Sequence, residues 1–261
     1  IGPYDLCISS NKKNIYLTNV YDNSLFKISM DSMKIEDVLP VGKFPIGVEA
    51  CGGLIFVISS DSNCVSIIDE ESFKNIENIS LGEKPIDVVI DKNNEKAYVA
   101  NGNGYSVDVI DIKKDTLETI KLNKNPIKIQ IENNLLYVLS NINNGVLNCS
   151  DVSVLDIESN VVKNVISLKG NYNNMVKPVG KEFVYITSQE NGYIYKIDLC
   201  TFSVSAKKKL DGMPSKILML GEHLFLISNI SKNCIIIFDT KSDKILEYIK
   251  VGKEPNGLVM I

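Results

Sequence analysis

The sequence of 261 residues contains no tryptophan, no arginine and one histidine, and these absences exclude several kinds of site. All 28 basic residues are lysine, so the planar guanidinium that binds phosphates and carboxylates in a bidentate manner is missing. A copper or haem centre commonly needs several histidine ligands. His223 stands alone in a polar turn, and it is interpreted as an exposed surface residue. We therefore expect no metal and no other cofactor.

Long apolar runs and closely spaced cysteines are missing too. No run of about 18 apolar residues occurs, which excludes a transmembrane helix. The six cysteines form no C-x-x-C pair, which argues against zinc knuckles and redox dithiols. Cys64 and Cys234 occupy equivalent positions in the segments SNCVSIID and KNCIIIFD. We interpret the cysteines as structural thiols rather than as a disulfide framework.

The most informative feature that the sequence does contain is an internal repeat. Two motifs, the aromatic segment AYVAN (97–101) and the segment VDVID (107–111), recur in variant form in every repeat and in phase with a proline. The step of 88 between two of these prolines spans two periods, and Tyr172 stands where the missing proline would lie. The prolines are spaced by 42, 40, 41, 88 and 41 residues: Pro3, Pro45, Pro85, Pro126, Pro214 and Pro255.

Each repeat is typical of four short β-strands. The β-branched and aromatic runs are bounded by Asn, Asp, Gly and Ser, and no helical period occurs. Four-stranded units at this period predict an all-β fold, a β-propeller of four-stranded antiparallel blades, because radial packing buries both faces of each unit. The proline step would join the outermost strand of one blade to the innermost strand of the next. Five acids that end third strands are interpreted as turn-forming rather than catalytic: Asp69, Asp111, Asp156, Asp198 and Asp239.

The segments AYVAN, VDVID and PIDV resemble the YVTN-repeat propeller family, which includes surface-layer repeat proteins and YncE-like proteins. The resemblance covers essentially the whole chain and implies a propeller that in this family commonly has seven blades. A single propeller domain over residues 1–261 is expected, as a segment of a longer, seven-bladed parent. We count six complete repeats, approximately 3–44, 45–84, 85–125, 126–171, 172–213 and 214–254, and one extra inner strand in residues 255–261 that starts a further repeat.

A ring of polar residues is predicted at the mouth of the central channel. The residue two positions after each repeat proline, or after Tyr172, opens an innermost strand, and these residues are mostly polar or charged. Such a ring could be a hydrated, self-neutralising tunnel or a site for a small polar or zwitterionic ligand. The candidate residues are Asp5, Asp87, Lys128, Asn174 and Lys216.

The fourth repeat is longer than the others and is the second candidate site. Its segment from the aromatic strand to the closing acid takes 21 residues, whereas four repeats take 15 and one takes 16. We expect a long loop over 141–151, lying beside the step 169–175 that lost its proline. The insertion could be a tolerated surface loop or a polar recognition site. Its candidate residues are Asn141, Asn143, Asn144, Asn148, Asp151, Asn171, Tyr172 and Asn173.

These features favour a non-catalytic binding scaffold whose ligand or partner meets the face that carries the inter-blade loops. The expected partner is a protein, a peptide, a glycan or a small polar ligand, and the chain is expected to be a monomer. One alternative is a hydrolase or lactonase-like enzyme with a site at the channel mouth. A second is single-stranded nucleic-acid binding, which the net charge of −4 and the missing arginine disfavour. The location would be the cell surface or outside the cell if a leader was removed, and otherwise the cytoplasm.

Overall fold

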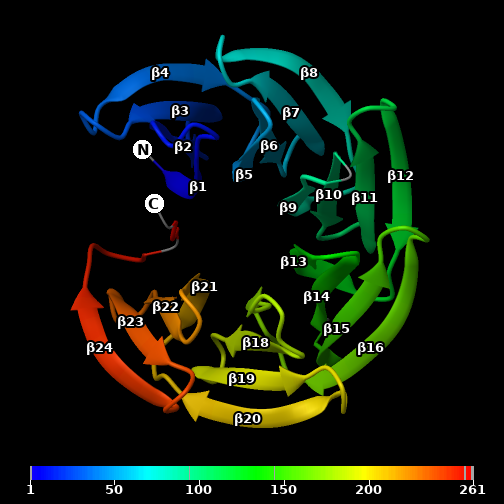
Figure 1. Cartoon of the computed structure of the whole chain (residues 1–261), viewed down its shortest axis with the longest axis vertical. Coiled ribbons are helices and arrows are strands. Elements are labelled where there is room, and N and C mark those ends of the chain that lie inside the picture. The colour runs from blue at the N-terminus through cyan, green and yellow to red at the C-terminus, as the bar shows by residue number, and fades with distance from the viewer. Residues whose placement is uncertain (1, 94, 144, 256, 260–261) are drawn as a thin grey trace. The chain divides into compact units, whose positions relative to one another are not determined.

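The computed structural model describes residues 2–93, 95–143, 145–255 and 257–259, which form 24 strands and no helix (Figure 1). The strands make six four-stranded antiparallel sheets, each connected in chain order as in β1-β2-β3-β4. This confirms the predicted all-β fold of four-stranded antiparallel units. Because none of the described residues is helical, none supplies a helix that could span a membrane.

The described residues divide into two compact units, one ending at Ile129 and one beginning at Gln130. The first unit contains three complete sheets. The first sheet is β1 (Pro3–Ile8), β2 (Asn14–Asn19), β3 (Ser24–Ser29) and β4 (Ile35–Pro40). The second is β5 (Pro45–Cys51), β6 (Leu54–Ser59), β7 (Cys64–Asp69) and β8 (Lys74–Ser80). The third is β9 (Pro85–Asp91), β10 (Lys96–Asn101), β11 (Ser106–Asp111) and β12 (Thr116–Lys121).

The second unit contains most of the fourth sheet and all of the last two. The fourth sheet is β13 (Asn125–Glu132), which crosses the boundary between the units, β14 (Leu135–Asn143), β15 (Asn148–Asp156) and β16 (Val161–Lys169). The fifth is β17 (Asn174–Val176), β18 (Phe183–Ser188), β19 (Tyr193–Asp198) and β20 (Ser203–Lys209). The sixth is β21 (Pro214–Leu220), β22 (Leu224–Asn229), β23 (Cys234–Asp239) and β24 (Lys244–Lys250).

The extra inner strand predicted in residues 255–261 falls only partly within the described residues. Positions 256, 260 and 261 lie outside them, and residues 257–259 form no strand. The start of a further repeat therefore stays a prediction.

The burial of each strand matches the residue types that it contains. Most of the second strands are largely buried, as in β6 with the sequence LIFVIS, because apolar side chains on both faces need cover from both sides. The fourth strands are exposed and charged, as in β8 with the sequence KNIENIS. Lysine and glutamate on these outer edges oppose pairing with another chain.

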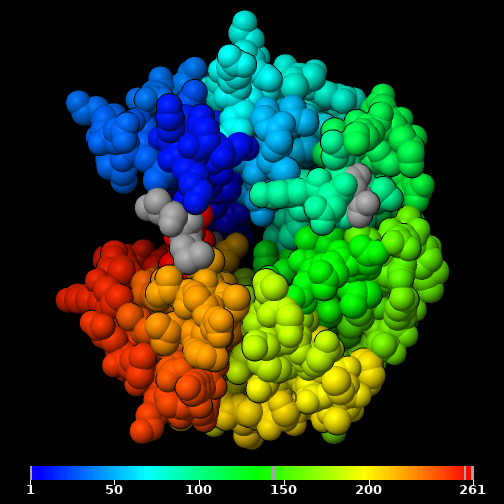
Figure 2. Space-filling model, in the orientation of Figure 1, coloured from blue at the N-terminus to red at the C-terminus, as the bar shows by residue number. Residues whose placement is uncertain are grey.

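Neighbouring sheets within each unit pack through their apolar side chains. In the first unit, fully buried Tyr16 and Ile55 belong to one cluster that joins the first sheet to the second. A further cluster joins the second sheet to the third, and the blue, cyan and green sheets form a continuous side-chain surface in Figure 2. In the second unit, the ring of Tyr185 packs edge-on against Phe225 with a centroid separation of 4.8 Å. Burying each such side chain stabilises the fold by about 1.5–3 kcal/mol.

Three connections, those that leave β4, β8 and β24, share one conformation. The residue before the proline adopts a left-handed φ, and its N–H donates to the Oδ1 of an asparagine in a preceding turn. The donors Phe44, Lys84 and Glu254 have φ values of 56°, 55° and 52°. They lie 2.9, 2.8 and 2.9 Å from their acceptors Asn23, Asn63 and Asn233. This repeated bond holds each connection against its turn, so the proline enters the following segment at a set angle.

Candidate functional site

The fourth sheet is extended relative to the other five. β14, β15 and β16 each contain nine residues, and β14 pairs with β15 over nine positions, compared with six between β10 and β11. The added pairs are Asn141 with Ser150, Ile142 with Cys149 and Asn143 with Asn148. The expected loop over 141–151 is therefore wrong for most of its length. An insertion of equal length on two paired strands keeps their register, so the backbone groups continue the ladder and form a longer hairpin.

The tip of this hairpin presents apolar side chains to solvent. Val146 is 89 % exposed and Leu147 is 52 % exposed. Asn148 beside them is exposed, and Asn141 at the base of the extension is half-buried. The predicted candidate Asn144 lies outside the described residues, and Asn143 is described only through its backbone pairing. These two adjacent residues give the tip an exposed apolar surface.

The connection between β16 and β17 lies beside the hairpin, as predicted. Ser150 Oγ donates to the carbonyl oxygen of Gly170 at 2.9 Å. Tyr172, which replaces the repeat proline, is buried, and its ring meets Tyr195 edge-on at a centroid separation of 5.1 Å. Its hydroxyl donates to the carbonyl oxygen of Lys169 at 3.2 Å. The tyrosine thus holds the connection by packing, without the fixed φ that proline supplies elsewhere.

The other candidates around this connection are mostly engaged within the fold. Asn173 Nδ2 donates to the carbonyl oxygen of Pro214 at 3.2 Å, which joins the fifth sheet to the sixth. Asp151 is buried and accepts a hydrogen bond from Ser167 Oγ at 2.7 Å. Asn171 is half-buried, and within the described part of the chain its Oδ1 has no hydrogen-bond partner. Asn173 and Asp151 therefore stabilise the hairpin and its surroundings, and their hydrogen bonds are made within the fold.

Three of the predicted channel-mouth residues lie on first strands of the first unit. Asp87 Oδ1 forms an ion pair with Lys128 Nζ at 2.8 Å, and its Oδ2 accepts from the backbone N–H of Ile129 at 2.7 Å. Asp5 Oδ2 accepts from the backbone N–H of Val48 at 3.3 Å. Each aspartate thus reaches from one first strand to the next and accepts from its edge N–H, and the Asp87–Lys128 pair neutralises two of the predicted charges.

Glu49 on β5 is a titratable residue of this cluster that the sequence reasoning missed. Burial raises the pKa of its carboxyl to about 7; the charge of Lys128 opposes this shift and the charges of Asp5 and Asp87 add to it. Burial lowers the pKa of the Lys128 ammonium, but the neighbouring carboxylates, led by Asp87, outweigh it and hold that pKa above its usual value. The sequence could have indicated this residue, because Glu49 is a charged residue in the otherwise largely apolar strand PIGVEAC.

The remaining two channel-mouth candidates lie in the second unit. Asn174 is buried at the start of β17, where it pairs with Thr187. Lys216 is half-buried on β21, and its backbone N–H donates to Ser228 Oγ at 3.0 Å.

A buried ion pair in the second unit was not predicted. β17 ends at Val176, and the next residue, Lys177, is 4 % exposed. Its Nζ contacts Glu132 in an ion pair, donates to the carbonyl oxygen of Pro178 at 3.1 Å and lies 5.3 Å from the centre of the Tyr137 ring. These contacts hold the segment after β17 against β13 and β14, so we interpret the pair as structural.

The structure confirms that the predicted turn acids hydrogen-bond to the backbone of their own turns. Asp69 Oδ1 accepts from the backbone N–H of Ser72 at 2.7 Å, and Asp198 Oδ1 accepts from that of Thr201 at 2.7 Å. These hydrogen bonds stabilise the ionised form and hold the pKa of both carboxyls below the usual range. Among the described residues, no group of three or more His, Cys, Asp or Glu side chains is placed to hold a metal ion. All six cysteines are free thiols.

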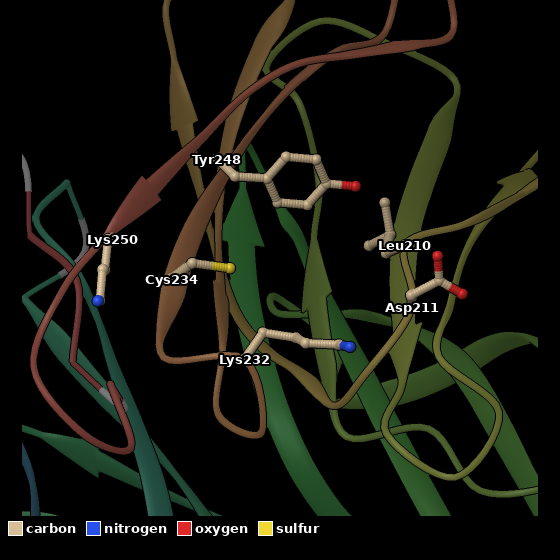
Figure 3. Close-up of a pocket in the computed structure, with 6 residues that line it drawn as sticks. All are labelled: Leu210, Asp211, Lys232, Cys234, Tyr248 and Lys250. Atoms are coloured by element: carbon tan, nitrogen blue, oxygen red, sulfur yellow. The ribbon is translucent and has the colours of Figure 1, made fainter.

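A pocket of about 390 Å³ lies between the β20–β21 connection and the sixth sheet (Figure 3). Six residues line it: Leu210, Asp211, Lys232, Cys234, Tyr248 and Lys250. The sequence reasoning did not identify this pocket. The sequence does show that this connection differs, because it reads LDGMP where three others read VGKFP, LGEKP and VGKEP.

No family model and no curated protein sequence matches the chain. Its structure is similar to that of hydrazine synthase from Kuenenia stuttgartiensis, with a TM-score of 0.87 and 17 % identity over 98 % of this chain and 88 % of that one. It is also similar to U3-55K, with a TM-score of 0.84 and 12 % identity over 98 % and 84 % of the two chains. Virginiamycin B lyase from Staphylococcus aureus gives a TM-score of 0.80 and 15 % identity over 98 % and 87 %. At these identities the likeness concerns the fold, a β-propeller in which the described residues form six four-stranded blades.

Proposed function

We propose that the chain is a non-catalytic binding scaffold of the YVTN-repeat propeller type, a single domain that binds a protein or peptide partner through the extended β14–β15 hairpin. The repeated segments AYVAN and VDVID support the family, and the propeller fold is compatible with a scaffold. A propeller hosts many functions, so the argument for this one depends on the site.

The observation that carries the proposal is the three added residue pairs of the fourth blade, which end in the exposed side chains of Val146 and Leu147. The blades otherwise present short turns, so a selective partner needs a feature that only one blade has. Apolar side chains at the centre of an interface contribute most of the binding free energy, whereas a polar rim excludes water. Exposed Asn148 beside the tip supplies a polar group of this kind without a formal charge.

The chemistry of the remaining candidates supports binding over catalysis. The turn acids already accept hydrogen bonds from their own turns, and the thiol of Cys7 has a pKa well above its usual value because it is buried. A thiol held in its neutral form is a poor nucleophile.

The test removes the apolar tip without shortening the sheet. The double variant Val146→Ser/Leu147→Ser should melt at the temperature of the parent chain, because both side chains already face solvent. Affinity capture from the native source, followed by direct titration of the captured protein, should give a partner that binds the parent and loses at least about tenfold in affinity for the variant.

The matched control is Val161→Ser/Val165→Ser on β16, which removes two exposed valines of the same blade away from the tip. This control should keep full affinity. A partner that binds the tip variant as well as the parent would contradict the hairpin site, and a specific chemical turnover by the parent would contradict the scaffold.

A further inference from the structure

The connection between β20 and β21 departs from the repeated glycine motif at one position. In three connections an apolar residue is followed by glycine, as Val41 is followed by Gly42, but here Leu210 is followed by Asp211. A Cβ at Gly42 would lie 2.6 Å from the Cβ of Ser59 and 3.0 Å from the Sγ of Cys64. That connection therefore lies directly on the second blade, and it has no room for the side chain that the sixth blade presents.

In the connection between β20 and β21 the glycine that approaches the blade closely lies one position later in the motif, at Gly212. A Cβ at Gly212 would lie 2.6 Å from the Oδ1 of Asn229, which occupies the place that Ser59 has in the second blade. Asp211 and Gly212 both adopt left-handed conformations, with φ values of 58° and 67°. We attribute the pocket beside Cys234 to this shift, because Leu210 and Asp211 form one of its walls.

The opposite wall carries side chains that the second blade lacks. Cys234 pairs with Lys250 and Ile236 pairs with Tyr248 across β23 and β24. In the second blade the same register places Ser80 opposite Cys64 and Asn78 opposite Ser66. Tyr248 and Lys250 therefore distinguish the sixth blade, although its cysteine is shared.

The charges and surfaces of the pocket define the ligand that fits. Figure 3 shows Lys232 extending toward Asp211, with Lys250 on the opposite side of Cys234. Two ammonium groups and one carboxylate leave a net positive charge, and the Tyr248 ring and Leu210 provide an apolar surface. The volume of about 390 Å³ suits a small molecule rather than a peptide side chain.

We propose that this pocket binds a small organic anion with an apolar body, whose anionic group meets Lys250 and whose body packs against Tyr248 and Leu210. Burial raises the pKa of the Cys234 thiol, so the sulfur contributes a neutral surface to this site. The site is independent of the β14–β15 hairpin, so either proposal can fail without the other.

The experiment titrates the isotope-labelled chain with benzoate and, separately, with benzamide, which has nearly the same shape but no charge. Benzoate should give saturable chemical-shift changes confined to residues 210–213, 232–234 and 248–250, and benzamide should bind at least about tenfold more weakly. Lys250→Gln should weaken benzoate binding by about tenfold or more, because the surplus positive charge is lost. Lys244→Gln, at the other end of β24, is the control and should bind as the parent does.

A second variant tests the origin of the pocket. Asp211→Gly combined with Gly212→Lys restores the glycine motif of the other connections, and it should abolish benzoate binding while the chain stays folded. The proposal is overturned if benzoate causes no saturable change, if benzamide binds equally well, or if Lys250→Gln binds benzoate as the parent does. Saturable changes confined to another part of the chain would also overturn it.

Discussion

Replacing Glu49 by glutamine should stabilise the chain at alkaline pH and leave its stability unchanged in acid. Glutamine keeps the shape of the protonated carboxyl but cannot ionise. In the folded chain, burial raises the pKa of Glu49 from 4.5 to about 7. Below about pH 4.5 the carboxyl is protonated in both the folded and the unfolded chain, so the variant gains nothing. Above pH 7 it is ionised in both, and the folded chain bears the full cost of a charge held beside Asp5 and Asp87.

The size of this stabilisation follows from the difference between the unfolded and folded pKa values of Glu49. A pKa raised from 4.5 to about 7 corresponds to roughly 3 kcal/mol of lost stability once the carboxyl is ionised. Because Glu49 is half-buried, solvent screens part of this cost, and we expect the variant to gain about 1–2 kcal/mol at pH 8.5.

The assay is urea unfolding of the parent and Glu49→Gln at pH 4.5 and at pH 8.5, followed by circular dichroism. Comparing the two chains at each pH cancels the titration of the groups that do not interact with Glu49. Glu77→Gln on the exposed strand β8 is the control, and it should give the same small difference at both pH values. An equal effect of Glu49→Gln at the two pH values, or a gain confined to acid, would refute the reasoning.

Two further substitutions test the structural interpretation of charged residues. Lys177→Met should lower the free energy of unfolding by about 3 kcal/mol, because it leaves the partly buried Glu132 carboxylate without its cation; a loss below about 1 kcal/mol in urea unfolding would show that the pair is not needed. Asp111→Ala should lower the melting temperature at pH 7 and have a smaller effect at pH 2. The hydrogen bond from the Lys114 N–H holds the Asp111 pKa below its usual value, so its contribution is present above about pH 4 and is lost as the pH falls through the folded pKa. A thermal scan that shows the same decrease at both pH values would contradict this role.

The repeat-level features could be predicted from the sequence because each depends on contacts that recur in every blade. Five strands begin at or one residue before a repeat proline, including β5 at Pro45 and β9 at Pro85, and the turn acids accept the expected backbone hydrogen bonds. Local chemistry is enough for these features, since a missing donor in proline and a short carboxylate at a turn act on neighbouring residues.

The fourth repeat shows where the sequence reasoning was incomplete. An insertion rich in asparagine predicts a loop, yet β14 and β15 pair through it as far as Asn143 and Asn148. Local propensity is a weak guide in strands, because the backbone of the partner strand supplies the hydrogen bonds whatever the side chains prefer. The adjacency of the hairpin and the β16–β17 connection was predicted correctly, since it follows from blade topology.

The sequence by itself determined the all-β class, the four-stranded units, the role of the turn acids and the absence of arginine chemistry. All of these depend on residue type and on spacing along one chain. Only the tertiary structure decided that Asp87 pairs with Lys128, that Glu49 is buried among charges and that a pocket opens beside Cys234. These features depend on how strands and connections that are distant in sequence approach one another, and Gly42 and Gly212 mark places where a connection lies too close to its blade for a Cβ atom. A change of one glycine to aspartate is small in sequence, but it displaces a connection because the close-packed interior has no room for the added atoms.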